Sequence, residues 1–537
     1  MKYLITSALP YANAELHLGH VLEIVQTDVW VRHKNLNGDQ AYYFCASDTH
    51  GTPVMLKAKQ LKIDPEDLVS DMKRNHEETF ANFNVNLTNF HTTHSKESED
   101  FVYDIFNKIN DKGHIYTKEI EQLYDEKENI FLADRFVKGE CPKCNSTDQY
   151  GDACEKCGTT YDALELINPI STLSQSKPVI KNSKHYFFAL SEFKDFLKTN
   201  IDSFSNQAPV KAKLNEWLDD ELNDWDISRD KPYFGFLIPG EEDKYIYVWL
   251  DAPIGYLSSI KHWCQNKNLN FEDLLNDKDT QLIHFIGKDI MYFHLLFWPS
   301  TLEASGFRQL SEVYVHGFMT IEGEKMSKSR GNFILADAAL EYAEADFYRY
   351  YICSKLGNDI SDIDFSIDDF VQKINSDLVG KFINIPSRTI NFIHKYNESK
   401  IINNQTKLND SFSNRFNQII ENTDKREYSK AIKEIMKIAD ETNAYISDNA
   451  PWNLAKNGKI KECLEVCSEA INVFYSLNTL LMPYIPNITS KVKKIMNNSD
   501  ERYSAIFNTT LGELNEFSHI IKRLDIENFK GLIEINE

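Results

Sequence analysis

The stretch LPYANAELHLGH, residues 9–20, joins an apolar segment to the start of a helix. Ahead of it, KYLITSA (2–8) is typical of a buried strand, and behind it LEIVQTDVWVRHKNLNG (22–38) has apolar residues at helical spacing. AYYFCAS (41–47) then predicts a second buried strand. A strand, a helix and a strand in this order predict a parallel sheet, so the expected fold class is α/β.

Two histidines mark the start of this helix. His17 and His20 are three positions apart, so their imidazoles share one helix face. Free backbone N–H groups and the dipole at a helix start favour an anion, and a phosphate is the natural candidate. Gly19 would let a flat ring such as adenine lie directly on the backbone. The alternative is a pair of ordinary helix histidines, because an HxxH pattern is common by chance.

The composition indicates a large globular protein with an acidic surface. A chain of 537 residues is too long for one hydrophobic core, so we expect about two to four units. With 59 Lys+Arg and 81 Asp+Glu the net charge is −22, which argues against a general nucleic-acid coat but allows local basic patches. No apolar run is long enough to predict a membrane span. Nine cysteines, four of them in one short segment, favour reduced thiols and a cytoplasmic protein.

The rest of the chain divides by pattern. DTHGTP (48–53) follows the second strand, at the edge where α/β proteins keep their chemistry. From about 115 to 230 the pattern breaks into short strand-like pieces, which predicts an insertion. YIYVWLDAP (245–253) and QLIHFIGKDI (281–290) predict a return to the sheet. Beyond about 370 apolar residues recur at helical spacing, which predicts an all-α bundle.

A second candidate phosphate-binding segment is EKMSKSRGN, residues 324–332. A loop carrying the ammonium groups of Lys325 and Lys328 is suited to a pyrophosphate leaving group, on which charge builds as the α-phosphorus bond breaks. The alternative is a solvated basic loop, the usual outcome for a short charge run.

CPKC and CEKC place four cysteines at the spacing of a zinc knuckle: Cys141, Cys144, Cys154 and Cys157. Four thiolates satisfy tetrahedral Zn²⁺ and leave no open position, so we expect one structural zinc site. The alternative of four free thiols is disfavoured by Pro142, Gly151 and Gly158, which supply tight turns.

HLGH and KMSKS together resemble the signatures of the class I aminoacyl-tRNA synthetases. The segments between them are similar to the methionyl-tRNA synthetases, and the resemblance extends to the C-terminus. The matching segments are ALPYAN, DTHGTP, WDISRDKPYFGF, YVWLDAPIGY, FIGKDIMYFH, VHGF and KMSKSRGN.

The resemblance implies a Rossmann-type catalytic domain split by a zinc-knuckle insertion and followed by an α-helical anticodon-binding domain. The expected boundaries are 1–114 and 231–320 for the catalytic halves, 115–230 for the insertion with its knuckle at 141–157, 321–370 for the KMSKS loop and stem-contact region, 371–520 for the anticodon-binding domain and 521–537 for the tail.

The resemblance also implies the site residues. ATP is expected at His17, Gly19, His20, Lys325, Ser327 and Lys328, of which the histidines and lysines are catalytic. Methionine is expected at Leu9, Tyr11, Asp48, Trp249, Ala252, Pro253, Tyr256, Ile290 and His294. Asp48 would hold the ammonium, and Leu9 and Tyr256 would offer hydrogen bonds to the sulfur. Arg229 and Asp289 are expected to support the active site.

The implied reaction forms methionyl-adenylate from methionine and ATP, with Mg²⁺ on the phosphates, and passes the methionyl group to tRNA. The anticodon is expected at Asn384, Arg388 and Trp452. A monomer is expected, because the C-terminal dimerisation domain that some relatives carry has no counterpart before Glu537.

Competing interpretations stay open. The leucine, isoleucine and valine enzymes share the signatures but need a larger editing insertion than 115–230, and the cysteine enzyme uses zinc for its amino acid. A small-cofactor nucleotidyltransferase would not depend on tRNA. A non-enzymatic zinc RNA-binding protein would show no pyrophosphate exchange.

Overall fold

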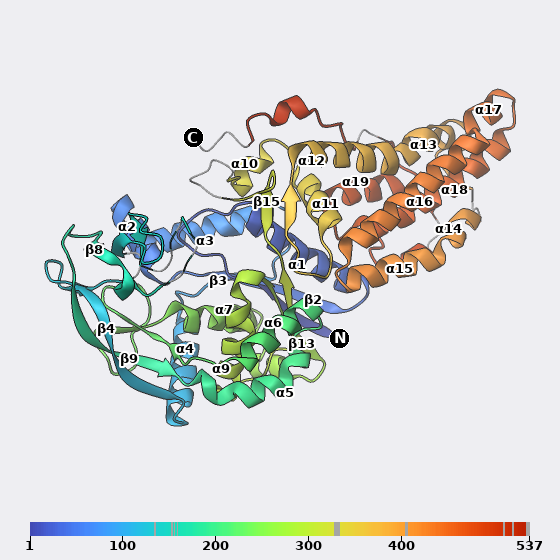
Figure 1. Ribbon diagram of the computed structural model, residues 1–537. Coiled ribbons are helices and arrows are strands. Elements are labelled where there is room, and N and C mark those ends of the chain that lie inside the picture. The colour runs from blue at the N-terminus through green and yellow to red at the C-terminus, as the bar shows by residue number, and fades with distance from the viewer. Residues whose placement is uncertain are drawn as a thin grey trace.

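A five-stranded parallel sheet lies at the centre of the N-terminal part of the computed structural model (Figure 1). The structure describes residues 1–133, 136–151, 154, 156–157, 159, 161–326, 333–402, 406–508, 511–517 and 520–532. The sheet order is β14-β13-β1-β2-β3, and each neighbouring pair is parallel. The strands are β1 (Lys2–Ser7), β2 (Gln40–Ser47), β3 (Asn89–Thr92), β13 (Thr280–Gly287) and β14 (Glu312–His316).

The strand order places a switch point at β1, which pairs with β2 on one side and with β13 on the other. Such a switch point opens a crevice at the carboxyl ends of the strands. LPYANAELHLGH follows β1 at this edge, and DTHGTP follows β2. Helix α1 (Leu18–Leu36) connects β1 to β2, so the predicted strand-helix-strand unit is confirmed.

Both faces of the sheet are covered, as a parallel sheet requires. Tyr3 and Ile5 of β1 join the core that contains α1 and the helical third, whereas Leu4 points into the other core. Among the helices that supply this second core are α4 (Lys96–Asp111), α7 (Val248–Asn266) and α9 (Trp298–Ser305).

One sequence expectation in the part of the chain that forms this sheet is wrong. YIYVWLDAP was expected to be a strand, but β12 (Lys244–Ile246) is short and α7 begins at Val248. Residues 250–260 of α7 are all buried. YIYVW is rich in aromatic and β-branched residues, which favour a strand, so the local composition did not reveal that a helix begins at Val248.

The insertion contains a four-stranded sheet, β10-β9-β4-β5, in which β5 (Ile130–Phe131) and β10 (Trp225–Asp226) have two residues each. The two central strands form a long ribbon, whereas only short pieces were expected. β4 (Ile115–Asp125) pairs with β9 (Val179–Phe188) in antiparallel fashion along nearly its whole length. The small sheet β7-β6-β8 carries the cysteine segment and consists of β6 (Val137–Glu140), β7 (Gln149–Tyr150) and β8 (Ile167–Ser171). The insertion ends in two helices that the sequence interpretation missed, α5 (Lys194–Phe204) and α6 (Ala208–Asp219).

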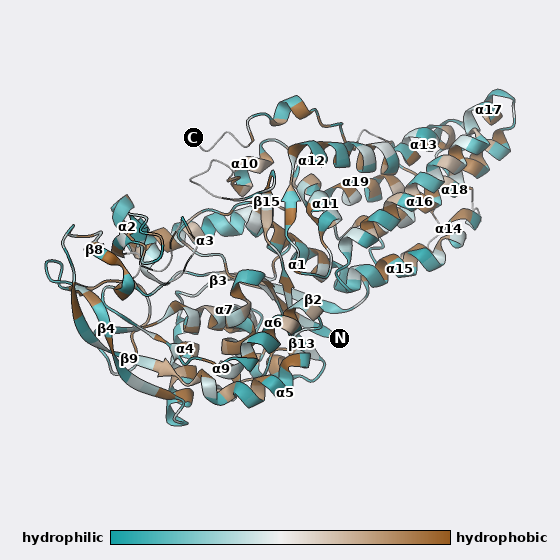
Figure 2. Cartoon of the chain, viewed as in Figure 1, coloured by the Kyte–Doolittle hydropathy of each residue, from teal (hydrophilic) through white to brown (hydrophobic). Residues whose placement is uncertain are grey.

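The expected all-α third is confirmed, and hydrophilic and hydrophobic faces alternate along its helices (Figure 2). Its helices are α12 (Ile367–Lys373), α13 (Asn384–Tyr396), α14 (Lys407–Ser411), α15 (Ser413–Asp424), α16 (Tyr428–Asn449), α17 (Pro451–Lys456), α18 (Ile460–Leu481), α19 (Pro486–Met496) and α20 (Ala505–Asn508). A π-helical segment, Ile374–Phe382, joins α12 to α13.

The remaining helices and strands connect these parts of the fold. The helices are α2 (Thr52–Leu61), α3 (Pro65–Asn82), α8 (Phe271–Asn276), α10 (Ala336–Leu340) and α11 (Ala345–Lys355). The strands are β11 (Ser228–Asp230), β15 (Met319–Ile321), β16 (Glu324–Lys325) and β17 (Ile363–Phe365). Within the described ranges, no helix has the length and apolarity that crossing a membrane requires.

A buried ion pair fixes α1 against the helical third. Nη2 of Arg349 lies 2.6 Å from Oδ2 of Asp28, and neither side chain is exposed. The same guanidinium donates to the backbone carbonyls of Phe83, Pro483 and Tyr484. The helix that begins with HLGH is therefore held rigidly at the junction of the sheet and the bundle.

Candidate active site

The segment after the KMSKS loop lies directly against HLGH. The N–H of Leu18 donates to the carbonyl of Ile334 (3.0 Å), and the N–H of Ala336 donates to the carbonyl of Leu16 (2.9 Å). His17 and Leu335 also form an isolated antiparallel bridge. Two segments far apart in sequence are thus joined by backbone hydrogen bonds at the carboxyl edge of the sheet.

Gly19 lies at the closest approach of the two segments. A Cβ on Gly19 would lie 2.7 Å from Cε of Met326 and 2.8 Å from Cε1 of His17, so a side chain there would displace one of them. Lys325 ends β16. Ser327 and Lys328 lie outside the described residues.

The two signature histidines cap their own helix. The N–H of Gly19 donates to Nδ1 of His17 (3.0 Å), and the N–H of His17 donates to Nδ1 of His20 (3.1 Å). A nitrogen that accepts such a bond carries no proton, so each neutral ring has its hydrogen on Nε2. Burial and the neighbouring His17 lower the pKa of His20 well below 6.5, and the ring centroids are 3.8 Å apart.

This capping changes the sequence interpretation in one respect. Backbone N–H groups at the helix start were expected to bind an anion. Two of them, those of His17 and Gly19, instead donate to the imidazoles of His20 and His17. The donors offered at this point are instead the Nε2–H groups, which project one ring further from the helix.

A cavity of about 800 Å³ opens at this edge of the sheet. It brings together every residue that was predicted for the substrate site and whose side chain is described. Those lining residues are Leu9, Tyr11, His17, Gly19, His20, Asp48, Arg229, Trp249, Ala252, Pro253, Tyr256, Asp289, Ile290 and His294.

The environment of Asp48 disfavours ionisation of its carboxyl group in the free protein. Asp48 follows the end of β2, and its Oδ1 is buried with no hydrogen-bond partner among the described residues. Burial, and then the nearby Asp251, raise the pKa of Asp48 well above its usual range. A cation delivered into the cavity would remove both penalties.

The aromatic end of the cavity has fixed hydrogen-bond directions. Nδ1 of His294 lies 3.1 Å from the carbonyl of Ile290, which can only accept, so Nε2 accepts from the Tyr256 hydroxyl at 2.7 Å. In this arrangement the Tyr256 hydrogen points at His294, and its expected bond to a ligand sulfur stays a prediction. Trp249 stacks on Phe293 with ring centroids 3.7 Å apart.

Arg229 lies at the cavity wall on β11. Its guanidinium stacks on Tyr247 at 3.5 Å from the ring centroid, and Nη1 lies 3.3 Å from Oδ2 of Asp226. This placement leaves the guanidinium beside both the cavity and a carboxylate.

Some cavity residues were missed by the sequence interpretation. Glu23 and His316 line the cavity, with Oε2 and Nε2 3.0 Å apart, and burial raises the pKa of Glu23. The next residue, Gly317, admits no side chain, because a Cβ would lie 2.1 Å from the carbonyl oxygen of Ser361. VHGF, which contains His316 and Gly317, was noted as a matching segment but no role was drawn from it.

The four knuckle cysteines converge. Their Sγ atoms all lie within 4.8 Å of one another, with Cys141 and Cys157 at 3.8 Å and Cys144 and Cys154 at 3.6 Å. Tetrahedral zinc with Zn–S bonds of about 2.3 Å requires S–S separations of about 3.8 Å, so the donor set fits. A hydrogen bond with Thr159 lowers the pKa of Cys157 to about 6, which favours the thiolate that a metal needs.

The predicted anticodon residues form one cluster far along the bundle (Figure 1). The Arg388 guanidinium lies 5.2 Å from the Trp452 ring centroid, and Trp452 is 40% exposed. Asn443 of α16, which the sequence interpretation missed, accepts from Asn384 at 2.8 Å and from Arg388 through its carbonyl at 3.1 Å. Only the helix pairing reveals Asn443, because it lies more than 50 residues from either partner.

Comparisons with known proteins agree with this architecture. Residues 3–390 match the family described as class I tRNA synthetases (M), and residues 397–522 match the anticodon-binding domain of methionyl tRNA ligase. A methionine–tRNA ligase from Psychrobacter cryohalolentis is 46% identical over 99% of this chain and 79% of its own length.

Solved structures share the fold. A Mycobacterium tuberculosis methionyl-tRNA synthetase in complex with methionyl-adenylate matches with a TM-score of 0.80 and 21% identity, covering 97% of this chain and 99% of that one. Its apo form matches with a TM-score of 0.73 and 19% identity, covering 98% of each chain. On the joined signatures, the split parallel sheet and these matches, the chain belongs to the methionyl-tRNA synthetase family of class I tRNA synthetases.

Proposed function

We propose that the cavity between HLGH and the KMSKS segment is where methionine and ATP form methionyl-adenylate. The observation that carries this proposal is the backbone pairing that joins residues 16–18 to 334–336 over a single cavity. The methionine carboxylate attacks the α-phosphorus of MgATP in line, the bond to the β-phosphate oxygen breaks, and pyrophosphate leaves.

The chain's own contribution to this step is positioning and charge stabilisation. The Nε2–H groups of His17 and His20 donate to the phosphates, and the ammonium groups of Lys325 and Lys328 take up the charge that develops on pyrophosphate. Asp48 binds the ammonium group of methionine. The thioether binds at the aromatic end of the cavity, beside Trp249, Tyr256 and His294, because a thioether is recognised by its shape and polarizability rather than by charge.

The second step transfers the methionyl group to the 2′-hydroxyl of the terminal adenosine of tRNA. The Asn384, Arg388 and Trp452 cluster is proposed to read the anticodon, with one base stacked on the exposed indole. α17 lies at the far end of the helical third, away from α7 (Figure 1), and α7 supplies several of the residues that line the cavity. Two separate sites are what the two ends of an extended RNA require.

Methionine-dependent pyrophosphate exchange tests the first step. Exchange should require methionine, and leucine, isoleucine, valine and cysteine should not replace it. Exchange without dependence on any amino acid would contradict the proposal.

We further propose one structural Zn²⁺ on Cys141, Cys144, Cys154 and Cys157. When bound, the metal supplies a cross-link between β6 and the rest of the small sheet and takes no part in the reaction, because four thiolates leave no open position. The proposed domain boundaries are those expected from the sequence. Nine unpaired cysteines support a reducing compartment such as the cytoplasm, and the monomeric state stays a prediction.

Removing the metal should loosen the insertion and spare the chemistry. Chelation, or Cys157→Ser, is expected to release about one zinc per chain and to lower amide protection in residues 137–171, while exchange falls by less than about tenfold. Because zinc binding releases thiol protons, affinity should fall as the pH falls. Cys264→Ser, at a buried cysteine outside the cluster, should keep full zinc content. Complete loss of exchange on chelation would contradict a structural role.

Trp452→Ala should separate the two steps. Since base stacking on an aromatic ring is worth about 1–3 kcal/mol, kcat/KM for tRNA charging is expected to fall about 5- to 150-fold while pyrophosphate exchange is unchanged. Phe507→Ala is the matched control, because Phe507 is 43% exposed and α20 packs near the opposite end of α18. Equal losses in both assays would instead indicate misfolding.

A further inference from the structure

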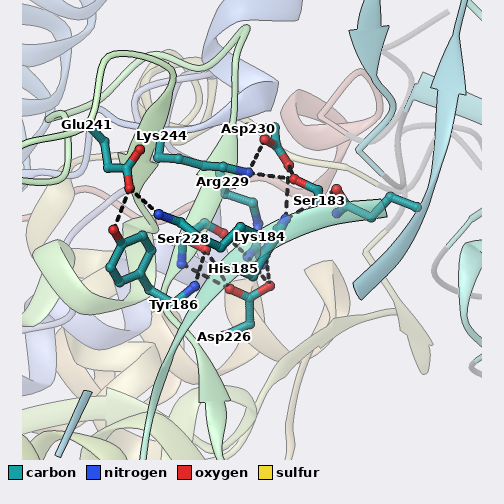
Figure 3. A network of polar contacts seen from close by, with 11 residues as sticks. Ser183, Lys184, His185, Tyr186, Asp226, Ser228, Arg229, Asp230, Glu241 and Lys244 are labelled. Atoms are coloured by element: carbon teal, nitrogen blue, oxygen red, sulfur yellow. Dashed lines mark hydrogen bonds and ion pairs between the residues drawn. The ribbon is translucent and has the colours of Figure 1, made fainter. Parts of the chain in front are cut away.

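A buried histidine in the insertion lies between two carboxylates. His185 of β9 is fully buried, with Nδ1 2.7 Å from Oδ2 of Asp226 and Nε2 2.9 Å from Oδ2 of Asp230 (Figure 3). Gln122 of β4 offers its amide oxygen to Nε2 at 3.2 Å. None of these residues was singled out in the sequence.

The geometry defines the charge of this imidazole. A carboxylate accepts hydrogen bonds and donates none, so both ring nitrogens must carry hydrogen and the ring is an imidazolium. Lys244 also pairs with Asp230, and Ser183 donates to the same carboxylate at 2.8 Å, so Asp230 is held ionised. Although burial lowers it, the two aspartates raise the pKa of His185 overall.

His185 shares its carboxylate with the cavity wall. Oδ2 of Asp226, which accepts from His185, is also the oxygen that lies 3.3 Å from Nη1 of Arg229. The other oxygen, Oδ1, accepts from the N–H and the hydroxyl of Ser228, each at 3.0 Å. Besides Arg229, two residues hold this carboxylate, because His185 and Ser228 together make three hydrogen bonds to it.

Two cations compete for one carboxylate. His185 and Arg229 both contact Oδ2 of Asp226, whereas Lys244 contacts Asp230. Of these three cations, only Arg229 lines the cavity. With a neutral residue at 185, Asp226 would have one charged partner fewer and would draw Arg229 more tightly to itself.

We propose that His185 is a positioning residue that occupies Asp226 and so keeps the charge of Arg229 available to an anionic group of the substrates in the cavity. The anion is a phosphate of ATP or the carboxylate of methionine. This inference rests on the proposed function, because it takes the cavity as the adenylation site. It also makes the β4–β9 ribbon, which carries His185 and Gln122, a supporting wall of that site.

The test is His185→Gln, which keeps a polar side chain of similar reach and removes the charge. In pyrophosphate exchange we expect KM for one substrate to rise about tenfold, with kcat changed less than about threefold and the melting temperature nearly unchanged. A rise for ATP assigns Arg229 to phosphate. A rise for methionine, with no change in the binding of methioninol, assigns it to the carboxylate.

Asp226→Asn provides the coupling test. Because His185 acts through that carboxylate, His185→Gln should change the affected KM by less than about twofold when residue 226 is already neutral. Additive effects of the two replacements would overturn the proposal. So would unchanged KM values for both substrates, or a parallel loss of kcat and melting temperature.

Two parallel variants make the result interpretable. His114→Gln is the matched control, since His114 also pairs with a carboxylate, Glu192 at 2.6 Å, but this carboxylate is not the one that contacts Arg229. The His114→Gln variant should behave as wild type. Arg229→Gln should raise the same KM as His185→Gln. If Arg229→Gln alone has an effect, the role of His185 is wrong and that of Arg229 stands; if neither has one, the proposed place of Arg229 in the site fails.

Discussion

Replacing His20 by asparagine is expected to slow adenylate formation about 100- to 1,000-fold while methionine binding stays intact. That range is typical for removal of one preorganised hydrogen-bond donor at developing charge. Oδ1 of asparagine can still accept from the His17 N–H, as Nδ1 of His20 does at 3.1 Å, but the side chain has no donor in the place of Nε2–H. Pyrophosphate exchange measures the rate, and equilibrium binding of methionine measures the ground state.

His20→Ala separates the cap from the donor. Alanine removes both, so the same loss of exchange should be joined by a loss of about 1 kcal/mol in the free energy of unfolding, the usual cost of a lost helix cap. If the asparagine variant kept near-wild-type exchange, Nε2 of His20 would not be a phosphate donor. If it lost stability as alanine does, the capping geometry would be wrong instead.

Short-range patterns explain what the sequence revealed. The first strand-helix-strand unit was readable because β1 and β2 are mostly apolar and α1 is a long run with Gly38 after it. The pairing of HLGH with KMSKS was predicted because both segments suit a triphosphate. The start of α7 was misread, because YIYVW is rich in aromatic and β-branched residues, which favour a strand, and Pro253 follows it.

Long-range pairing explains what the sequence did not reveal. The proton positions on His17 and His20 depend on which backbone N–H each Nδ1 faces, and the role of Asn443 depends on a contact across 55 residues. His185 is a histidine in an unremarkable strand until β10 and β11 place Asp226 and Asp230 on either side of it. Such residues become visible only when the chain has folded.

Asp48→Asn should raise KM for methionine about 100-fold or more. Removing one partner of a buried ion pair costs about 3–5 kcal/mol, and the ammonium of methionine would face a neutral amide. The carboxylate is poised for this ligand, because its Oδ1 is buried with no partner among the described residues. KM for ATP in the same exchange assay should change far less, which separates loss of the ammonium site from general damage to the cavity.

The raised pKa of Asp48 gives this prediction a pH signature. In the free enzyme, as the pH falls through that raised value, the carboxyl takes up a proton and loses its attraction for the ammonium, so kcat/KM for methionine should fall at acid pH. The asparagine variant should lack this acid limb. Asp251→Asn should move the limb to lower pH, since Asp251 is one cause of the raised pKa.

The same carboxyl should destabilise the empty fold. In the unfolded chain Asp48 ionises near its ordinary value of 3.8, whereas in the fold it ionises only at higher pH. The cost of folding therefore appears as the pH rises above 3.8 and is complete above the folded pKa. Asp48→Asn removes that cost. At neutral pH the free energy of unfolding of the variant should therefore exceed that of the wild type by about 1 kcal/mol, although the variant binds methionine poorly. Below pH 3.8 the two proteins should be equally stable. Saturating methionine should stabilise only the wild type, because only there does the ligand supply the missing cation.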